Sequence, residues 1–140
     1  MGLWKYIAVA LLAIGLSVPP SGADAKATAK QVEKAATADE LIALGATKLS
    51  AAQFKQMIVG KPLSNKKQGW SWIIDANGTT SSSAADGSWK EENAPWKMKG
   101  DDYCTKNEGC RSVFLIGNLM RMSDKSDATK LSAWTVSVGK

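Results

Sequence analysis

The 140-residue sequence contains no histidine, only two cysteines, and no apolar run long enough to cross a membrane as a helix. The missing histidine excludes Ser-His-Asp and Cys-His catalytic arrangements, imidazole general bases and histidine metal sites. The longest apolar stretch, residues 7–18, falls short of the roughly 20 residues that a membrane-spanning helix needs. Catalysis by carboxylates, lysine or tyrosine remains open.

The first 25 residues have the three-part layout of a secretory signal peptide. Lys5 lies near the amino terminus, residues 7–18 are apolar or small, and a Pro-Pro pair precedes Ala23-Asp24-Ala25, which matches an A-x-A cleavage site. No cysteine follows that site, so a lipid anchor is not indicated. We therefore expect residues 1–25 to be removed and the protein to be periplasmic or secreted.

The two cysteines, Cys104 and Cys110, are separated by five residues. In an oxidising compartment such a pair predicts one disulfide that closes a short hairpin. A metal or redox pair is the alternative. However, C-x5-C without a histidine or further cysteine is poor zinc spacing, and it is not the C-x-x-C of an oxidoreductase. We expect no metal site and no cofactor.

The chain carries 18 Lys and Arg against 13 Asp and Glu, a net charge of +5. Outside the cytoplasm such an excess would favour anionic lipids, lipopolysaccharide or acidic glycans, and not nucleic acid. A net charge of this size is also ordinary for a soluble small domain. The lysines are scattered along the chain, which favours the second interpretation.

Two capping boxes predict two short helices before residue 60. Residues 37–40 read T-x-x-E and predict a helix over residues 38–44, within a helical lead-in over residues 26–48. Residues 50–53 read S-x-x-Q and begin the second helix. Its large apolar side chains share one face at helical spacing: Phe54, Met57 and Ile58.

After Pro62 the apolar spacing changes from a period of 3.6 to a period of 2, which is typical of strands. Short apolar runs are separated by glycine-containing turns, and residues 91–95 are expected to break one of them. Residues 79–85 fit either an edge strand or a loop. We predict an α+β fold: two short N-terminal helices followed by a small antiparallel β-barrel or sandwich of six or seven strands.

A resemblance to a known family rests on local motifs that follow the A-x-A signal: residues 49–55, Gly60-Lys61, residues 75–79, residues 87–89, and the cysteine pair with residues 113–122. In this order they resemble a group of small exported lipocalin-like proteins of Gram-negative bacteria, a family of unknown function. The motifs are caps, turns and core positions. The resemblance implies export and a single lipocalin-like β domain over residues 49–140.

Five tryptophans follow residue 25, and all lie on predicted strands: Trp70, Trp72, Trp89, Trp96 and Trp134. Flat amphipathic rings stack on sugars, lipids or bases, and neighbouring lysines would suit an anionic ligand. Inward-facing residues of a small packed barrel give the same pattern, so core packing is the alternative for each ring. We predict that Trp70, Trp72, Trp89 and Trp134 line a ligand site.

The acidic pairs lie beside turns or caps, where carboxylates have ordinary structural roles: Asp39-Glu40, Glu91-Glu92 and Asp101-Asp102. Sequence neighbours point to opposite faces of a strand, so no pair alone supplies the two carboxylates of a glycosidase. We expect a non-enzymatic envelope binding protein that holds a small apolar or anionic amphiphilic ligand or an envelope component. The alternative is a protein-interaction module or inhibitor that acts through the Cys104–Cys110 hairpin. Neither nucleic-acid binding nor stable membrane insertion after cleavage is expected.

Overall fold

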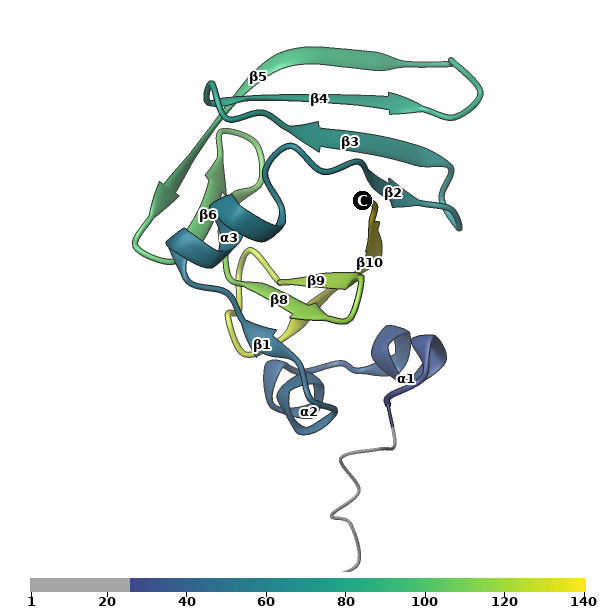
Figure 1. The fold of residues 1–140 in the computed structure, drawn as a ribbon, viewed down its shortest axis with the longest axis vertical. Helices are drawn as coiled ribbons and strands as arrows, with labels where there is room; N and C mark the ends of the chain where they lie inside the picture. Colours follow the sequence, from purple (N-terminus) through teal and green to yellow (C-terminus); the bar gives the residue numbers. More distant parts are fainter. Residues whose placement is uncertain (1–25) are drawn as a thin grey trace, which may run out of the picture.

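The computed structural model describes residues 26–140 (Figure 1). The expected signal peptide, residues 1–25, lies outside the described residues. Within residues 26–140, no helix is long and apolar enough to span a membrane. The elements are α1 (Ala29–Lys34), α2 (Ala38–Ala43), β1 (Thr47–Lys48), α3 (Ala51–Met57), β2 (Leu63–Asn65), β3 (Trp70–Ile74), β4 (Thr79–Ala84), β5 (Lys90–Lys99), β6 (Asp102–Thr105), β7 (Gly109–Arg111), β8 (Val113–Ile116), β9 (Leu119–Ser123) and β10 (Leu131–Val138).

The strands form one antiparallel sheet in the order β1-β8-β9-β10-β2-β3-β4-β5-β6-β7, which curls into a half-barrel (Figure 1). The α+β class and the antiparallel sheet are confirmed. The expected count of six or seven strands is wrong, because the sheet has ten. β1 and β2 have two and three residues, too few to show a period of 2 in the sequence. Residues 79–84, which fitted a strand or a loop, form β4.

β5 is one ten-residue strand although Pro95 lies inside it, so the expected break at residues 91–95 is wrong. Residues 90–95 pair with β4, and residues 96–99 pair with β6. Pro95 therefore lies where the strand changes partner, and its missing N–H interrupts neither ladder. Asn93 has φ of +59° beside the register shift with β4. Trp89, expected on a strand, lies in the turn before β5.

Side-chain caps begin all three helices. In α3, Ser50 Oγ accepts from the Gln53 N–H at 3.2 Å and Gln53 Oε1 accepts from the Ser50 N–H at 2.9 Å. Thr37 caps α2 in one direction only, accepting from the Glu40 N–H at 3.2 Å. Both expected helices are therefore confirmed, and α1 is a third. Met57 is exposed, contrary to expectation, so α3 buries only Phe54, and Ile58 is buried just after it at the C-cap.

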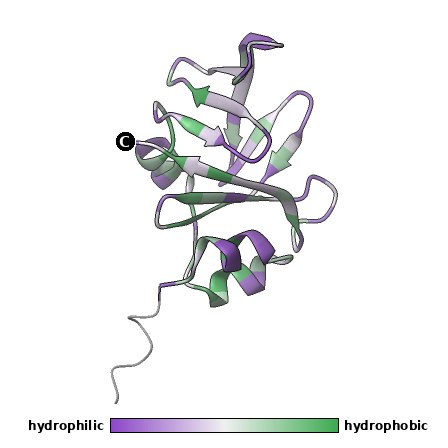
Figure 2. Ribbon diagram, turned by 90° about the vertical axis from the view of Figure 1, so that its right-hand side faces the viewer, coloured by the Kyte–Doolittle hydropathy of each residue, from purple (hydrophilic) through white to green (hydrophobic). Residues whose placement is uncertain are grey.

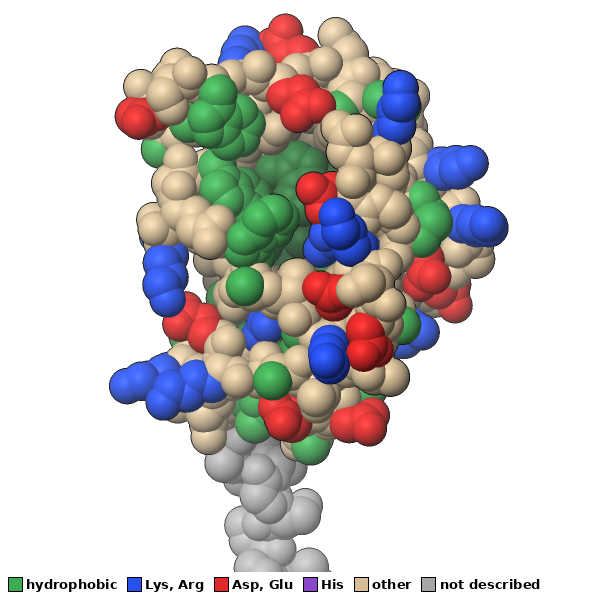
Figure 3. Space-filling model, turned by 180° about the vertical axis from the view of Figure 1, so that it is seen from behind, with side chains coloured by type: hydrophobic (Ala, Val, Ile, Leu, Met, Phe, Trp, Pro, Cys, Tyr) green, Lys and Arg blue, Asp and Glu red, His purple; other side chains and the backbone are tan. Residues whose placement is uncertain are grey.

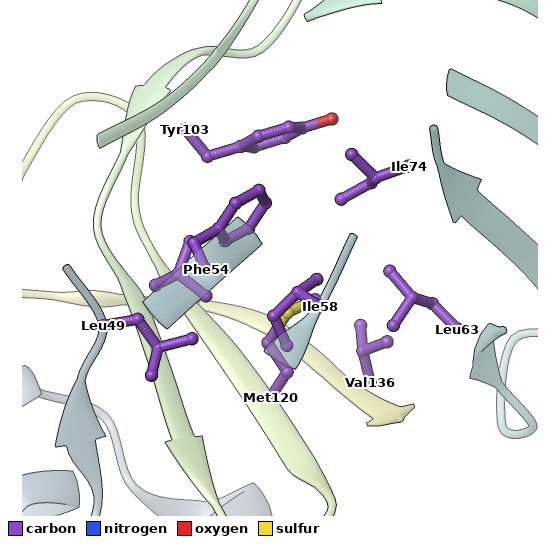
Figure 4. Close-up of a cluster of buried hydrophobic side chains, with 9 residues drawn as sticks. Leu49, Phe54, Ile58, Leu63, Ile74, Tyr103, Met120 and Val136 are labelled. Carbon is purple, nitrogen blue, oxygen red and sulfur yellow. The ribbon is translucent and has the colours of Figure 1, made fainter. Parts of the chain in front are cut away.

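The sheet separates two apolar cores. The core on the concave side takes side chains from α3 and six strands (Figure 4): Leu49, Phe54, Ile58, Leu63, Ile74, Tyr103, Val113, Met120 and Val136. On the outer side, α1 and α2 pack against Phe114. Val113 and Phe114 are neighbours that serve opposite cores, as the alternation of a strand requires. Figure 2 shows hydrophobic and hydrophilic residues interspersed along the strands and helices.

The outer core contains one buried charge, Arg121 of β9. Its guanidinium donates to the carbonyl oxygens of Val32, of Glu33 at 3.3 Å and of Ser132 at 2.7 Å. Burial lowers the pKa of Arg121, and the carboxylate of Glu33 opposes that shift. Arg121 thus fastens the C-terminal turn of α1 to the sheet, where a positive charge also complements the helix dipole.

Candidate functional site

The concave side of the half-barrel holds an open cavity of about 770 Å³. Its walls come from β3, β4, the first half of β5, the β6–β7 hairpin and β10. Figure 3 looks into a hollow whose floor is hydrophobic and whose rim carries acidic, basic and neutral polar groups. Ligand cavities commonly measure about 300–1,000 Å³ and combine apolar walls with a few polar groups. This hollow is therefore the candidate site.

All four tryptophans predicted to line a ligand site line this cavity: Trp70, Trp72, Trp89 and Trp134. Trp70 connects two of the others, with ring centroids 6.2 Å from Trp72 and 6.0 Å from Trp134. The interplanar angles of 64° and 74° are the edge-to-face arrangement that aromatic pairs prefer. Trp89 and Trp134 are 46% and 40% exposed. The cavity thus has an aromatic wall with two of its rings partly open to solvent.

Trp96 packs against the core, which is the alternative that the sequence left open for each tryptophan. It is not among the residues that line the cavity. Its indole N–H donates to the Asp75 carbonyl oxygen at 2.8 Å, and its ring packs edge-on against Phe54 at 5.9 Å. Residue type alone therefore does not decide the role of a tryptophan in this fold.

Tyr103, on β6, belongs to both the cavity wall and the concave core. It is 3% exposed, and its ring lies 5.7 Å from Trp72 and 5.3 Å from Phe54. The buried hydroxyl has no hydrogen-bond partner within residues 26–140. Burial raises the pKa of Tyr103 far above its ordinary value. The hydroxyl therefore stays protonated at neutral pH and remains a hydrogen-bond donor.

The disulfide between Cys104 and Cys110 is confirmed, and it joins directly opposed residues of β6 and β7. The tip of that hairpin, residues 106–109, lines the cavity. The disulfide-bonded hairpin is thus part of the cavity wall. A disulfide also indicates an oxidising, non-cytoplasmic compartment.

Arg111, at the end of β7, is a cavity residue that sequence analysis missed. It is 8% exposed. Its Nη2 forms an ion pair with the Glu108 carboxylate, and its Nε donates to the Glu108 carbonyl oxygen at 3.4 Å. Glu108 therefore lies over the guanidinium from the tip of the same hairpin.

The acidic pairs singled out in the sequence have separate surroundings. Asp101 accepts from the Ala51 N–H at 2.9 Å at the start of α3. Glu91 and Glu92 line the cavity, and Glu92 forms an exposed ion pair with Lys90 at 2.7 Å. Across residues 26–140, no group of three or more His, Cys, Asp or Glu side chains is placed to hold a metal ion.

Comparisons with models of protein families, with curated proteins and with solved structures find no match. The geometry of the chain itself therefore defines its class. It is a disulfide-bonded antiparallel half-barrel with a cavity walled by aromatic side chains.

Proposed function

We propose that the protein is an exported binding protein that holds a small apolar or amphiphilic ligand, or an envelope component of that chemistry, in its cavity. The observation that carries this proposal is the convergence of Trp70, Trp72, Trp89 and Trp134 on one hollow. Ligand cavities are lined predominantly by hydrophobic and aromatic side chains, and a large exposed apolar surface on a monomer commonly marks a binding site.

The aromatic wall is suited to binding because it is already formed. Trp70 is held between Trp72 and Trp134 by edge-to-face contacts. A ligand that stacks on such rings loses little free energy to the ordering of protein side chains. It also gains about 25 cal/mol for each Å² of apolar surface removed from water.

The alternative role, a protein-interaction loop or inhibitor, receives less support. Residues 106–109 of the hairpin face the cavity and form part of its wall. An insertion loop would instead present its tip away from the body of the domain. The placement of the tip supports a hairpin that contributes to a ligand site.

The proposal can be tested with N-phenyl-1-naphthylamine, a neutral dye whose emission rises in apolar sites, and the oxidised full chain. We expect saturable binding, and a loss of about tenfold in affinity for Trp134→Ala because one wall of the cavity is removed. Ile73→Ala is the matched control, since Ile73 is exposed on β3 and does not line the cavity. Absence of saturable binding, or equal losses in the two variants, would overturn the proposal.

A further inference from the structure

The inner face of the β6–β7 hairpin carries two buried residues, Tyr103 and Arg111, each of which has a hydrogen-bond donor in its side chain. Tyr103 and Arg111 are directly opposed in the antiparallel register, so their side chains leave the same face of the sheet. Both line the cavity, and both are more than nine-tenths buried. The aromatic wall of Trp70, Trp72 and Trp134 belongs to the same cavity.

Arg111 is the buried charge of this cavity. The other charged residues of its wall are exposed: Glu91, Glu92, Lys106 and Glu108. Exposed charges are screened by water and salt, whereas a buried guanidinium acts at short range with little screening. A ligand that reaches the inner wall of the cavity therefore meets one buried charged group, the guanidinium of Arg111.

The guanidinium of Arg111 has more N–H donors than its hydrogen bonds to Glu108 use. A guanidinium carries five N–H groups in a planar fork. Glu108 accepts from Nε and from Nη2. Among the described residues, Nη1 has no acceptor, yet it is not one of the atoms sealed from solvent. Arg111 can therefore donate to an oxygen atom of a ligand while it keeps its hydrogen bonds to Glu108.

Resting on the proposed function, we infer that the ligand is a small carboxylic acid with a flat apolar body. Its body packs on the tryptophan wall, and its carboxylate accepts hydrogen bonds from Arg111. Tyr103, opposite Arg111 in the ladder, contributes its ring to the apolar part of the same wall. Glu108 and the two rim glutamates repel any anion in proportion to its charge, so a singly charged carboxylate is disfavoured less than a doubly charged phosphate.

The test compares 2-naphthoate with 2-naphthamide, which have nearly the same shape and differ in charge, by isothermal titration of the oxidised full chain. We expect wild type to bind the acid about tenfold more tightly, as a charge-assisted hydrogen bond provides. Arg111→Gln should bind the two probes within about twofold of each other. Lys97→Gln, which removes one exposed positive charge from β5 outside the cavity wall, should keep the tenfold preference.

A second measurement uses the wild-type protein alone, so it does not depend on whether a variant folds. The preference of wild type for the acid should persist when sodium chloride is raised from about 50 mM to about 500 mM, because a buried contact is poorly screened. Equal binding of the two probes by wild type would overturn the inference and leave the proposed function standing. A preference that survives in Arg111→Gln, or disappears with salt, would also overturn it. Binding of neither probe would overturn the inference and the proposed function together.

Discussion

Replacing Tyr103 by phenylalanine should stabilise the folded protein. The substitution removes a buried hydroxyl that has no partner within residues 26–140. It keeps the ring that packs against Phe54 at 5.3 Å, Trp72 at 5.7 Å and Trp96 at 5.9 Å. Burying an unpartnered hydroxyl costs about 1–3 kcal/mol. Losing the few dispersion contacts of one oxygen atom offsets less than about 0.5 kcal/mol of this. We therefore expect a gain of about 1 kcal/mol in the free energy of unfolding.

Urea unfolding of the oxidised protein, followed by tryptophan fluorescence, measures this gain as a higher midpoint at unchanged slope. Tyr103→Ala is the contrasting variant, because it removes the ring as well and should cost about 3–5 kcal/mol. A Phe variant less stable than wild type would refute the reasoning. It would mean that the hydroxyl has a partner, such as an ordered water, that stabilises the fold.

The same substitution should change how the free energy of unfolding depends on pH at alkaline pH. Burial raises the pKa of Tyr103 in the folded protein above its ordinary value of about 10. Folding therefore favours the neutral hydroxyl, and this contribution is complete below about pH 10 and is lost as the pH rises further. Wild type should lose up to about 1.4 kcal/mol per pH unit there, a loss that Tyr103→Phe avoids. The difference in free energy of unfolding between the two proteins should grow from about pH 9 to about pH 11. A constant difference would contradict the raised pKa of Tyr103 in the folded protein.

Two further substitutions test other parts of the fold by urea unfolding. Changing Cys104 and Cys110 together to Ser should lower the free energy of unfolding by about 2 kcal/mol, the loop-closure value for so short a ring. Wild type reduced with dithiothreitol should lose the same amount. An unchanged urea midpoint would contradict a stabilising role of the disulfide. Arg121→Met should cost about 2–3 kcal/mol because three carbonyl oxygens lose their buried donor. The exposed Lys125→Met is its control, and equal effects would show that Arg121 does not fasten α1.

Capping residues and turn glycines in the sequence correctly predicted where short helices begin and where strands turn. The caps at Thr37 and Ser50 begin α2 and α3 as expected. Gly117, with φ of +57°, forms one of the expected glycine-containing turns, here between β8 and β9, because a two-residue hairpin needs a residue that adopts positive φ easily. The run through Pro95 was misjudged because a strand that changes partner leaves no trace in propensity.

The candidate site depends on longer-range information. Alternation places Trp70 and Trp72 on one face of β3, but it does not say that this face is hollow. Trp96 has the same side chain and joins the core, since β5 has crossed to β6 at that point. Tyr103 and Arg111 were missed, although the sequence held a signal. Once Cys104 is opposite Cys110 in an antiparallel hairpin, the residues on either side must also be opposite each other.

The register of the β6–β7 hairpin explains the position of the Cys104–Cys110 disulfide. β7 ends the order of the sheet and pairs only with β6 among the described strands, through three residue pairs. A slip of one residue would turn Arg111 to the opposite face of the sheet and remove the charge from the cavity, because side chains alternate along a strand. Three pairs at an edge hold such a register weakly. The disulfide joins the middle pair, adjacent to the pair that carries Tyr103 and Arg111. It therefore fixes the orientation of both buried donors as well as stabilising the hairpin.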